Sequence, residues 1–331
     1  MKRRPSGSIT LSDAVIGFVN HKLAEGLTDR SVNSYERLLN KWIEYEGNKE
    51  VTAVTTTDIR KYLAWLRTEY VPRRYNGKVH KLSPKTLRNI WVTLSSFFGW
   101  ASLELDCDNP MQNIPAPKIQ KSPVEAFTKE EIDALLKACS YTRKAETRYR
   151  ESFSFVRPTA KRDRAMILML LDTGLRAREI TSLLISNVNL KTGKVIVEHG
   201  VIGGAKGGKG RTVFIGKSSR RALWRYLSSR EDGDDPDSPL FLAIGDRKLS
   251  TNALRLLIKS LAGKADVKDA YPHKFRHTFA ITYLRSGGDV FTLQALLGHS
   301  TLDMVRHYAK IAEIDIEQAH RKASPVDNWR L

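Results

Sequence analysis

The sequence predicts a mainly α-helical protein with one small antiparallel β-sheet, built as two domains. The 331 residues exceed the usual size of one domain, and 41% of them are hydrophobic, which is enough for two cores. Helix start signals recur along the chain, whereas β-branched residues suggest two strands in 195–198 and 211–215. Prolines gather in 109–123, where we expect an extended linker and a boundary between residues 1–115 and 116–331.

Helix starts are predicted from capping residues and from proline at the first helical position. In the N-terminal domain the predicted starts are Thr10, Arg30, Thr55 with Asp58, and Ser83 with Pro84. In the C-terminal domain they are Thr128 with Glu131, Ser250, Pro272, Val290 and Leu302. The two strands are joined by a glycine-rich loop with two lysines. The stretch 141–164 has no clear periodicity, which favours an inserted, mobile loop.

Charge indicates the kind of partner. The formal net charge is +19, and part of the excess lies in two runs without any acidic residue. The runs contain Arg73, Arg74, Lys78, Lys81, Lys85 and Arg88, and then Lys206, Lys209, Arg211, Lys217, Arg220 and Arg221. A single basic run is as often merely a solvated surface as a binding site for a partner. Two runs together favour nucleic acid, because lysine and arginine displace counterions from phosphates.

Apolar runs and cysteines indicate the compartment. The longest apolar run, 165–171, is far shorter than the roughly 18 residues of a membrane helix. Two cysteines, Cys107 and Cys139, are too few for a disulfide framework. We therefore expect a cytoplasmic protein that does not contact membrane and that associates with the nucleoid if DNA is its partner.

Histidines cluster towards the C-terminus, where His273 and His307 bound four of the eight. His273 and His277 have the spacing of two metal ligands, but Arg276 between them would repel a cation. His273 and Arg276 lie three residues apart, so an imidazole and a guanidinium can face one phosphate oxygen. The same HxxR pattern also fits an ordinary helix start with an ion pair. We expect no metal and no cofactor.

Two further motifs contain residues suited to phosphate. In TGLRAREI a glycine permits a sharp bend that can aim Arg176 inward, and Glu179 can hold that arginine by an ion pair. In LGHS, His299 precedes Tyr308 by nine positions. A lone tyrosine on an amphipathic helix is usually a core residue, so the tyrosine gains weight only from the motifs around it.

The ordered set of TGLRxxEI, a lysine on a hairpin, HxxRH, LGHS and a tyrosine nine residues after the last histidine resembles the catalytic domain of tyrosine recombinases and phage-type integrases. The resemblance extends by pattern to the helical module and linker, which are similar to the family's DNA-clamping core-binding domain. It implies a site-specific recombinase that cleaves and rejoins DNA through a 3′-phosphotyrosyl intermediate, without metal or ATP. Mobile-element or phage integration and excision are the implied processes.

The resemblance also implies six catalytic residues. They are Arg176 and Arg276 as the phosphate clamp, His273 and His299 as hydrogen-bonding or acid/base residues, Lys206 as general acid and Tyr308 as nucleophile. Lys209 is the alternative to Lys206, because both lie in the same glycine-rich loop. His277 and His307 adjoin these positions and are expected to be structural or orienting residues.

Strand exchange in this family implies double-stranded DNA with specific sites and a homotetramer in the synaptic complex, and it leaves room for accessory DNA-bending proteins. The tail 312–331 is expected to pack onto a neighbouring subunit. Arg178 and the long stretch 141–164 depart from the family pattern. Two alternatives stay open, a type IB topoisomerase that reseals the same strand and a DNA-binding regulator without catalysis.

Overall fold

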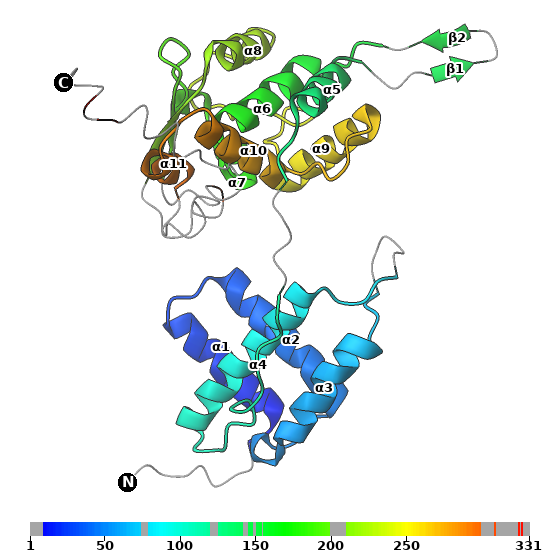
Figure 1. Ribbon diagram of the computed structural model, residues 1–331, viewed down its shortest axis with the longest axis vertical. Coiled ribbons are helices and arrows are strands. Elements are labelled where there is room, and N and C mark those ends of the chain that lie inside the picture. Colours follow the sequence, from blue (N-terminus) through cyan, green and yellow to red (C-terminus); the bar gives the residue numbers. More distant parts are fainter. Residues whose placement is uncertain are drawn as a thin grey trace. The chain divides into compact units, whose positions relative to one another are not determined.

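The computed structural model describes residues 9–73, 79–119, 125–141, 145–147, 150–153, 155–198 and 210–298, with Tyr308, Ser324 and Val326. The chain divides into two compact units, Met1–Ser122 and Pro123–Leu331 (Figure 1). This division falls inside the proline-containing stretch 109–123. Helices dominate both units and the strands are short, which confirms the predicted fold class.

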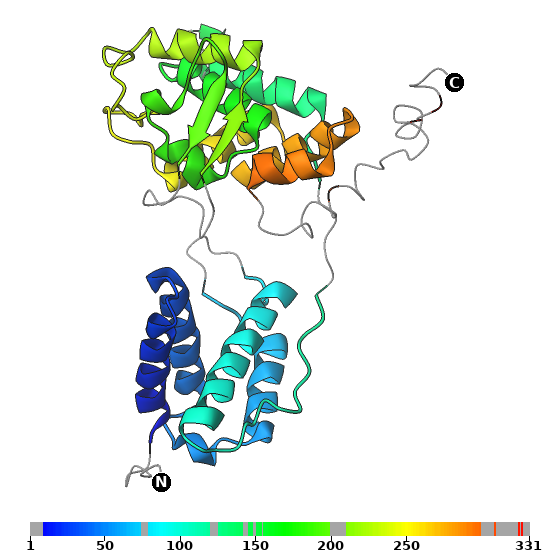
Figure 2. The same cartoon turned by 90° about the vertical axis from the view of Figure 1, so that its left-hand side faces the viewer.

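The described residues of the N-terminal unit form a bundle of four α-helices (Figure 2). They are α1 (Leu11–Ala24), α2 (Asp29–Glu46), α3 (Thr56–Thr68) and α4 (Pro84–Glu104), with the short 3-10 helix η1 (Val51–Ala53) before α3. The side chains of Thr10, Thr55 and Ser83 cap α1, α3 and α4 as predicted. Aromatic rings fill the core, where Phe18 meets Phe97 edge-on at 5.6 Å between ring centroids and Trp42 meets Phe98 at 5.4 Å.

The first part of the predicted linker belongs to this bundle. Met111 and Ile114 are buried in its core. The Trp91 indole Nε1 donates a hydrogen bond to the Ile114 carbonyl oxygen at 3.1 Å, and Arg88 Nη1 donates to the Pro117 carbonyl oxygen at 3.1 Å. Residues 109–117 are therefore attached to α4 rather than extended between the units.

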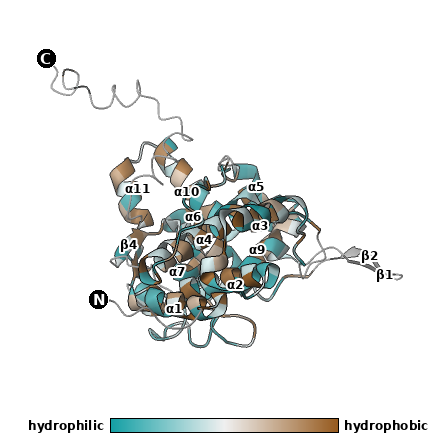
Figure 3. Cartoon of the chain, turned by 90° about the horizontal axis from the view of Figure 1, so that it is seen from below, coloured by the Kyte–Doolittle hydropathy of each residue, from teal (hydrophilic) through white to brown (hydrophobic). Residues whose placement is uncertain are grey.

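The C-terminal unit packs its helices around α6. The helices of its described part are α5 (Lys129–Ser140), α6 (Ala160–Thr173), α7 (Ala177–Ser182), α8 (Lys217–Leu227), α9 (Thr251–Ala265), α10 (Pro272–Arg285) and α11 (Val290–Leu297), with the 3-10 helix η2 (Ile185–Asn187). Helices α5, α8 and α10 all contact α6. Hydrophobic and hydrophilic residues share these helices in Figure 3, as amphipathic helices on one core require. No helix in the described ranges is long and apolar enough to cross a membrane.

The predicted small sheet is present. Strands β3 (Lys194–Val197) and β4 (Arg211–Phe214) pair antiparallel, with Val195 opposite Val213. Both valines are buried in the core of the unit. The glycine-rich loop between the strands lies outside the described residues, apart from Glu198 and Gly210 at its ends.

The stretch 141–164, predicted to be a loop, contains strands and the start of a helix in its described part. Strands β1 (Ala145–Thr147) and β2 (Arg150–Phe153) pair antiparallel, and this hairpin extends away from the helices in Figure 1. From residue 160 the chain is already helical. The sequence pattern did not predict this helix start, because the charged Asp163 lies on the buried face of the helix. There Asp163 accepts hydrogen bonds from Thr159 and Arg162 and pairs with Arg157.

Candidate active site

A glycine turn sets the direction of Arg176. Helix α6 ends at Gly174, which has the left-handed backbone angle φ of 61°. A Cβ atom at this position would lie 2.5 Å from Cδ1 of Phe279 on α10, so glycine is required both by the backbone and by the packing. Two residues later Arg176 caps α7, and its side chain points back toward the end of α11.

Glu179 on α7 holds Arg176 in place. The Arg176 backbone N–H and Nη1 each donate to the Glu179 carboxylate at 2.8 Å. Arg211 at the start of β4 donates from Nη1 and Nη2 to the same carboxylate at 2.9 and 2.7 Å. Burial raises the pKa of Glu179, but the hydrogen bonds and charge of Arg211 and the hydrogen bonds of Arg176 outweigh it and bring that pKa to about 2. The carboxylate therefore stays charged at neutral pH and fixes two arginines at once.

Arg276 on α10 is the second arginine of the site and is fully buried. Its Nη1 donates to the Gly174 carbonyl oxygen at 2.9 Å, and its Nη2 donates to the Leu297 carbonyl oxygen at 2.7 Å. Arg176 Nη2 donates to the next carbonyl oxygen, that of Gly298, at 3.3 Å. Burial, helped by the charge of Arg176, lowers the pKa of Arg276 to about 9, so its guanidinium is still charged at neutral pH.

Tyr308 lies beside these arginines. Its side chain is fully buried in a cluster with Ile281, Leu284, Leu293 and Leu297 of α10 and α11. Burial raises the pKa of the Tyr308 hydroxyl, and the charges of Arg276 and Arg176 partly oppose that rise. The hydroxyl is therefore protonated at neutral pH and within the electrostatic reach of both guanidinium groups.

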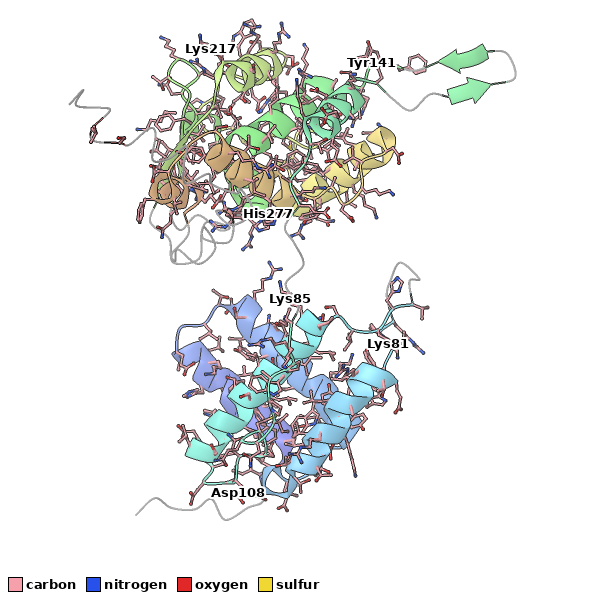
Figure 4. The ribbon with its side chains drawn as sticks, viewed as in Figure 1. Lys81, Lys85, Asp108, Tyr141, Lys217 and His277 are labelled. Carbon is pink, nitrogen blue, oxygen red and sulfur yellow. The ribbon has the colours of Figure 1, made fainter. Side chains whose placement is uncertain are left out.

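Two histidines of α10 complete the described part of the site (Figure 4 labels His277). His277 Nδ1 and the Tyr308 hydroxyl oxygen are 2.8 Å apart, at hydrogen-bonding distance. The His273 and His277 rings meet edge-on with centroids 4.5 Å apart, and His273 is exposed to solvent. Of these three side chains, the His273 imidazole thus lies on the solvent side and the Tyr308 hydroxyl lies at the buried end.

The structure brings together Arg176, Arg276 and Tyr308 of the six predicted residues, with His273 at the edge of the group. Lys206 and His299 lie outside the described residues. So do Lys209, His307 and most of the tail 312–331, of which Ser324 and Val326 are described. Among the described residues, no cluster of three histidine, cysteine, aspartate or glutamate side chains could hold a metal ion.

Sequence reasoning missed Arg211 as a member of this site and left His277 outside the catalytic residues. Arg211 was only one residue of a basic run, yet it is bound bidentately to Glu179 and its Nε donates to the Leu296 carbonyl oxygen at 2.7 Å. His277 was expected to be structural or orienting, and it contacts the Tyr308 hydroxyl directly. The sequence did contain a signal for Arg211. In a β-strand, side chains two positions apart lie on the same face, so Arg211 shares a face with the apolar Val213, which is buried.

Comparison with known proteins identifies the family. The Phage integrase family profile matches residues 125–313, and the profile of the phage integrase N-terminal SAM-like domain matches residues 17–104. The chain is 30% identical over 308 residues to tyrosine recombinase XerA of Thermococcus kodakarensis, with 92% of each chain covered. It is 28% identical over 323 residues to tyrosine recombinase XerC of Leptospira interrogans, covering 96% of this chain and 95% of that protein.

Solved structures share the fold. The XerH site-specific recombinase bound to palindromic difH substrate, a post-cleavage complex, gives a TM-score of 0.70 at 18% identity and covers 99% of this chain and 100% of its own. The Tn1549 transposon integrase in complex with a circular intermediate DNA gives 0.69 at 19% identity, with 91% and 95% covered. The first profile alone matches more than half of the sequence, and the chain therefore belongs to the phage integrase family, the tyrosine recombinases, enzymes that break and rejoin DNA strands.

Proposed function

We propose that this tyrosine recombinase exchanges DNA strands at specific sites through a covalent bond between Tyr308 and a 3′-phosphate. The observation that carries the proposal is the convergence of Arg176, Arg276 and Tyr308. Two guanidinium groups are fixed by buried protein acceptors next to one tyrosine hydroxyl. A DNA phosphate beside them would meet a charge clamp and a nucleophile together.

The proposed reaction uses the clamp to stabilise charge. The Tyr308 oxygen attacks phosphorus, a tyrosyl–phosphorus bond forms, and the bond from phosphorus to the 5′-oxygen breaks. Arg176 and Arg276 stabilise the negative charge on the non-bridging oxygens, to which His273 and His299 add hydrogen bonds. Lys206, or Lys209 from the same loop, gives the 5′-oxygen its proton. The energy of the phosphodiester is retained in the new bond, so another 5′-hydroxyl can reverse the step without ATP.

The N-terminal unit is proposed to clamp the duplex, with residues 1–115 as the DNA-clamping domain and 116–331 as the catalytic domain. Support comes from a surface hollow of about 1010 Å³ lined by α2, α3 and α4. Its lining includes the donors Asn33, Arg37, Asn40 and Lys41 of one face of α2. Glu36 and Glu44 share this face, so phosphate contacts would fall to the donors between them.

The proposed partners are two double-stranded recombination sites and three further copies of this chain. In the synaptic homotetramer the tail 312–331 would pack onto a neighbouring subunit, and accessory DNA-bending proteins would assist. The proposed place of action is the nucleoid in the cytoplasm, and mobile-element or phage integration and excision are the processes that suit the chemistry. Deleting residues 315–331 should weaken cooperative synapsis and spare single-site binding, in a two-site gel-shift assay.

The test is capture of the covalent intermediate. A library of random-sequence duplexes, each with a nick, is incubated with the protein in EDTA, and complexes that survive SDS are sequenced. Wild type should form an adduct at the DNA 3′ end, and Tyr308→Phe should form none while it still binds the selected DNA. An adduct in both proteins would show that Tyr308 is not the nucleophile.

The selected site then separates the alternatives. Joining of strands from two different duplexes is the outcome expected of a recombinase. Relaxation of a supercoiled plasmid without any joining between duplexes would favour a type IB topoisomerase. Specific binding of the selected duplexes without an adduct from wild type would favour a DNA-binding regulator.

A further inference from the structure

We propose that His277 is a catalytic residue, which holds the Tyr308 hydroxyl and accepts its proton as the tyrosine attacks phosphorus. This inference rests on the proposed role of Tyr308 as nucleophile. It gives the base step to a residue outside the predicted six: Lys206 donates a proton to the leaving oxygen, and another group must remove one from the attacking oxygen, which His277 contacts directly.

The geometry is that of a base and its nucleophile. His277 Nδ1 lies 2.8 Å from the Tyr308 hydroxyl oxygen, inside the range of roughly 2.6–3.2 Å for a proton transfer partner. His277 is 9% exposed and Tyr308 is 0% exposed, so this contact is shielded from water. The hydroxyl donates to Nδ1 when the imidazole carries its own proton on Nε2.

The neighbouring charges couple this proton transfer to DNA. His277 contacts the His273 ring and the Tyr308 hydroxyl, and the Tyr308 hydroxyl is within the electrostatic reach of Arg276 and Arg176. In the free protein the two guanidinium groups disfavour a further positive charge nearby. A phosphate held by both arginines would bring negative charge to the same place, which favours the imidazolium that forms when the proton moves. The base therefore becomes effective when the substrate is in position.

The alternative is that the hydrogen bond merely satisfies a buried hydroxyl. Thr278, the next residue of α10, has that kind of role, because its hydroxyl donates to the Lys274 carbonyl oxygen and accepts from the Phe127 N–H, both at 2.8 Å. His277 differs in two respects. Its partner is the proposed nucleophile, and an imidazole can take up a proton near neutral pH where a hydroxyl cannot.

The proton balance is complete without any co-reactant. In cleavage the Tyr308 proton moves to His277 Nδ1, the oxygen–phosphorus bond forms, the bond to the 5′-oxygen breaks, and the general acid protonates that oxygen. In rejoining the deprotonated general acid takes the proton of a 5′-hydroxyl as its oxygen attacks phosphorus, the tyrosyl–phosphorus bond breaks, and the imidazolium returns its proton to the tyrosine oxygen. His277 would thus act as base in one direction and as acid in the other.

The experiment separates the two ends of the reaction with a modified substrate. The probe is the selected duplex with sulfur in place of the bridging 5′-oxygen at the scissile phosphate, because a thiolate leaves without being protonated. Single-turnover cleavage is compared for wild type, His277→Asn, His277→Ala, Lys206→Ala and Lys209→Ala. Asparagine keeps an acceptor near the Nδ1 position but cannot take the proton. His21→Asn is the matched control, since His21 is a half-buried histidine of α1 that pairs with Glu25.

We expect the His277 variants to cleave slowly, and we expect the sulfur-containing duplex not to restore their cleavage rate. Both His277 variants should cleave the normal duplex about 100-fold or more slowly than wild type, which is the lower end of the range for general acid–base catalysis, and equally slowly the sulfur-containing duplex. The lysine variant that lacks the general acid should recover with sulfur. Addition of imidazole should partly restore His277→Ala. DNA binding of the two His277 variants should stay within about threefold of wild type, since His277 is shielded from solvent.

Several outcomes would overturn the proposal. If His277→Asn cleaves the normal duplex within threefold of the wild-type rate, His277 is not the base. If the sulfur-containing duplex restores the cleavage rate of His277→Asn, the residue acts at the leaving oxygen instead. If the variants do not fold, wild type still provides a test, since cleavage of the sulfur duplex must show an ionisation between about pH 5 and pH 8. A flat pH profile would overturn the proposal. Failure of wild type itself to form an adduct would instead contradict the proposed function.

Discussion

At the scale of single residues, Glu179 organises the described site. It is 1% exposed and accepts hydrogen bonds from Arg176 on one side and from Arg211 on the other. Arg211 in turn bonds to the Leu296 carbonyl oxygen. One buried carboxylate thus links the start of α7, the start of β4 and the end of α11, three segments that precede or follow predicted catalytic residues.

We predict that Arg211→Lys slows cleavage by about tenfold or more, because an ammonium group cannot replace the two parallel hydrogen bonds of the guanidinium. DNA binding should change by less than about threefold. Arg220→Lys is the matched control, since Arg220 Nη1 donates to the Lys191 carbonyl oxygen and not to Glu179. Equal cleavage rates for Arg211→Lys and wild type, measured in single turnover, would show that Arg211 does not position Arg176.

Glu179 should also affect the stability of the folded protein at acid pH. Its pKa in the folded protein is about 2, below the ordinary value of 4.5, so the ionised carboxylate stabilises the fold above pH 4.5. This stabilisation is lost as pH falls from 4.5 towards 2. Chemical denaturation of wild type and Glu179→Gln across this range checks the prediction. The stability difference between the two proteins should shrink with falling pH, and a constant difference would contradict it.

At the scale of elements, two left-handed glycines close the site. Gly174 ends α6 and Gly298 ends α11, with φ of 61° and 63°. Carbonyl oxygens at these two ends accept the hydrogen bonds of Arg276 and Arg176. The helix ends therefore aim the arginines, and each depends on a backbone conformation that other residues rarely adopt.

We predict that Gly174→Ala destabilises the catalytic unit by about 2 kcal/mol or more, because an alanine with positive φ is strained and its Cβ would collide with Phe279. Gly99→Ala is the control. Gly99 lies inside α4, and a Cβ there meets nothing within 4 Å. That substitution should stabilise the N-terminal unit by about 0.5–1 kcal/mol. Thermal unfolding of both variants decides, and a stabilised Gly174→Ala would refute the argument.

The elements also show what sequence could and could not predict. Starts with a local chemical signature were predicted well, since Thr10, Thr55 and Thr128 form capping boxes with residues three positions later. The start of α6 was missed, because Asp163 is buried through ion pairs that only the tertiary structure provides. In the site, motif residues were predictable, whereas Arg211 depends on a contact across 32 positions of sequence.

At the scale of the whole molecule, two separate cores have consequences for unfolding. Leu39 is fully buried in the N-terminal core and Leu254 in the C-terminal core. We predict two thermal transitions, with Leu39→Ala lowering one and Leu254→Ala the other, each at a cost of about 2–5 kcal/mol. Calorimetry of the full chain measures both. A single transition shifted equally by the two variants would contradict independent units.

The net charge of +19 predicts steep salt dependence of DNA binding. If about six phosphates are contacted, affinity should fall by roughly 1,000-fold between 50 and 200 mM salt. Binding isotherms at several salt concentrations give the slope. Arg37→Ala should reduce that slope by about one unit if Arg37 of α2 contacts a phosphate, and an unchanged slope would remove Arg37 from the interface.

The attachment of residues 109–117 to α4 sets how closely the two units are tethered. Pro117 is held by Arg88, and Phe127 is held by Thr278 of α10. These anchors are ten positions apart, 127 minus 117, so the chain between them spans at most about 35 Å. If both units grip one duplex, as proposed, the tether keeps the second unit near the DNA once the first has bound. Two individually weak grips on DNA would then act as one strong one.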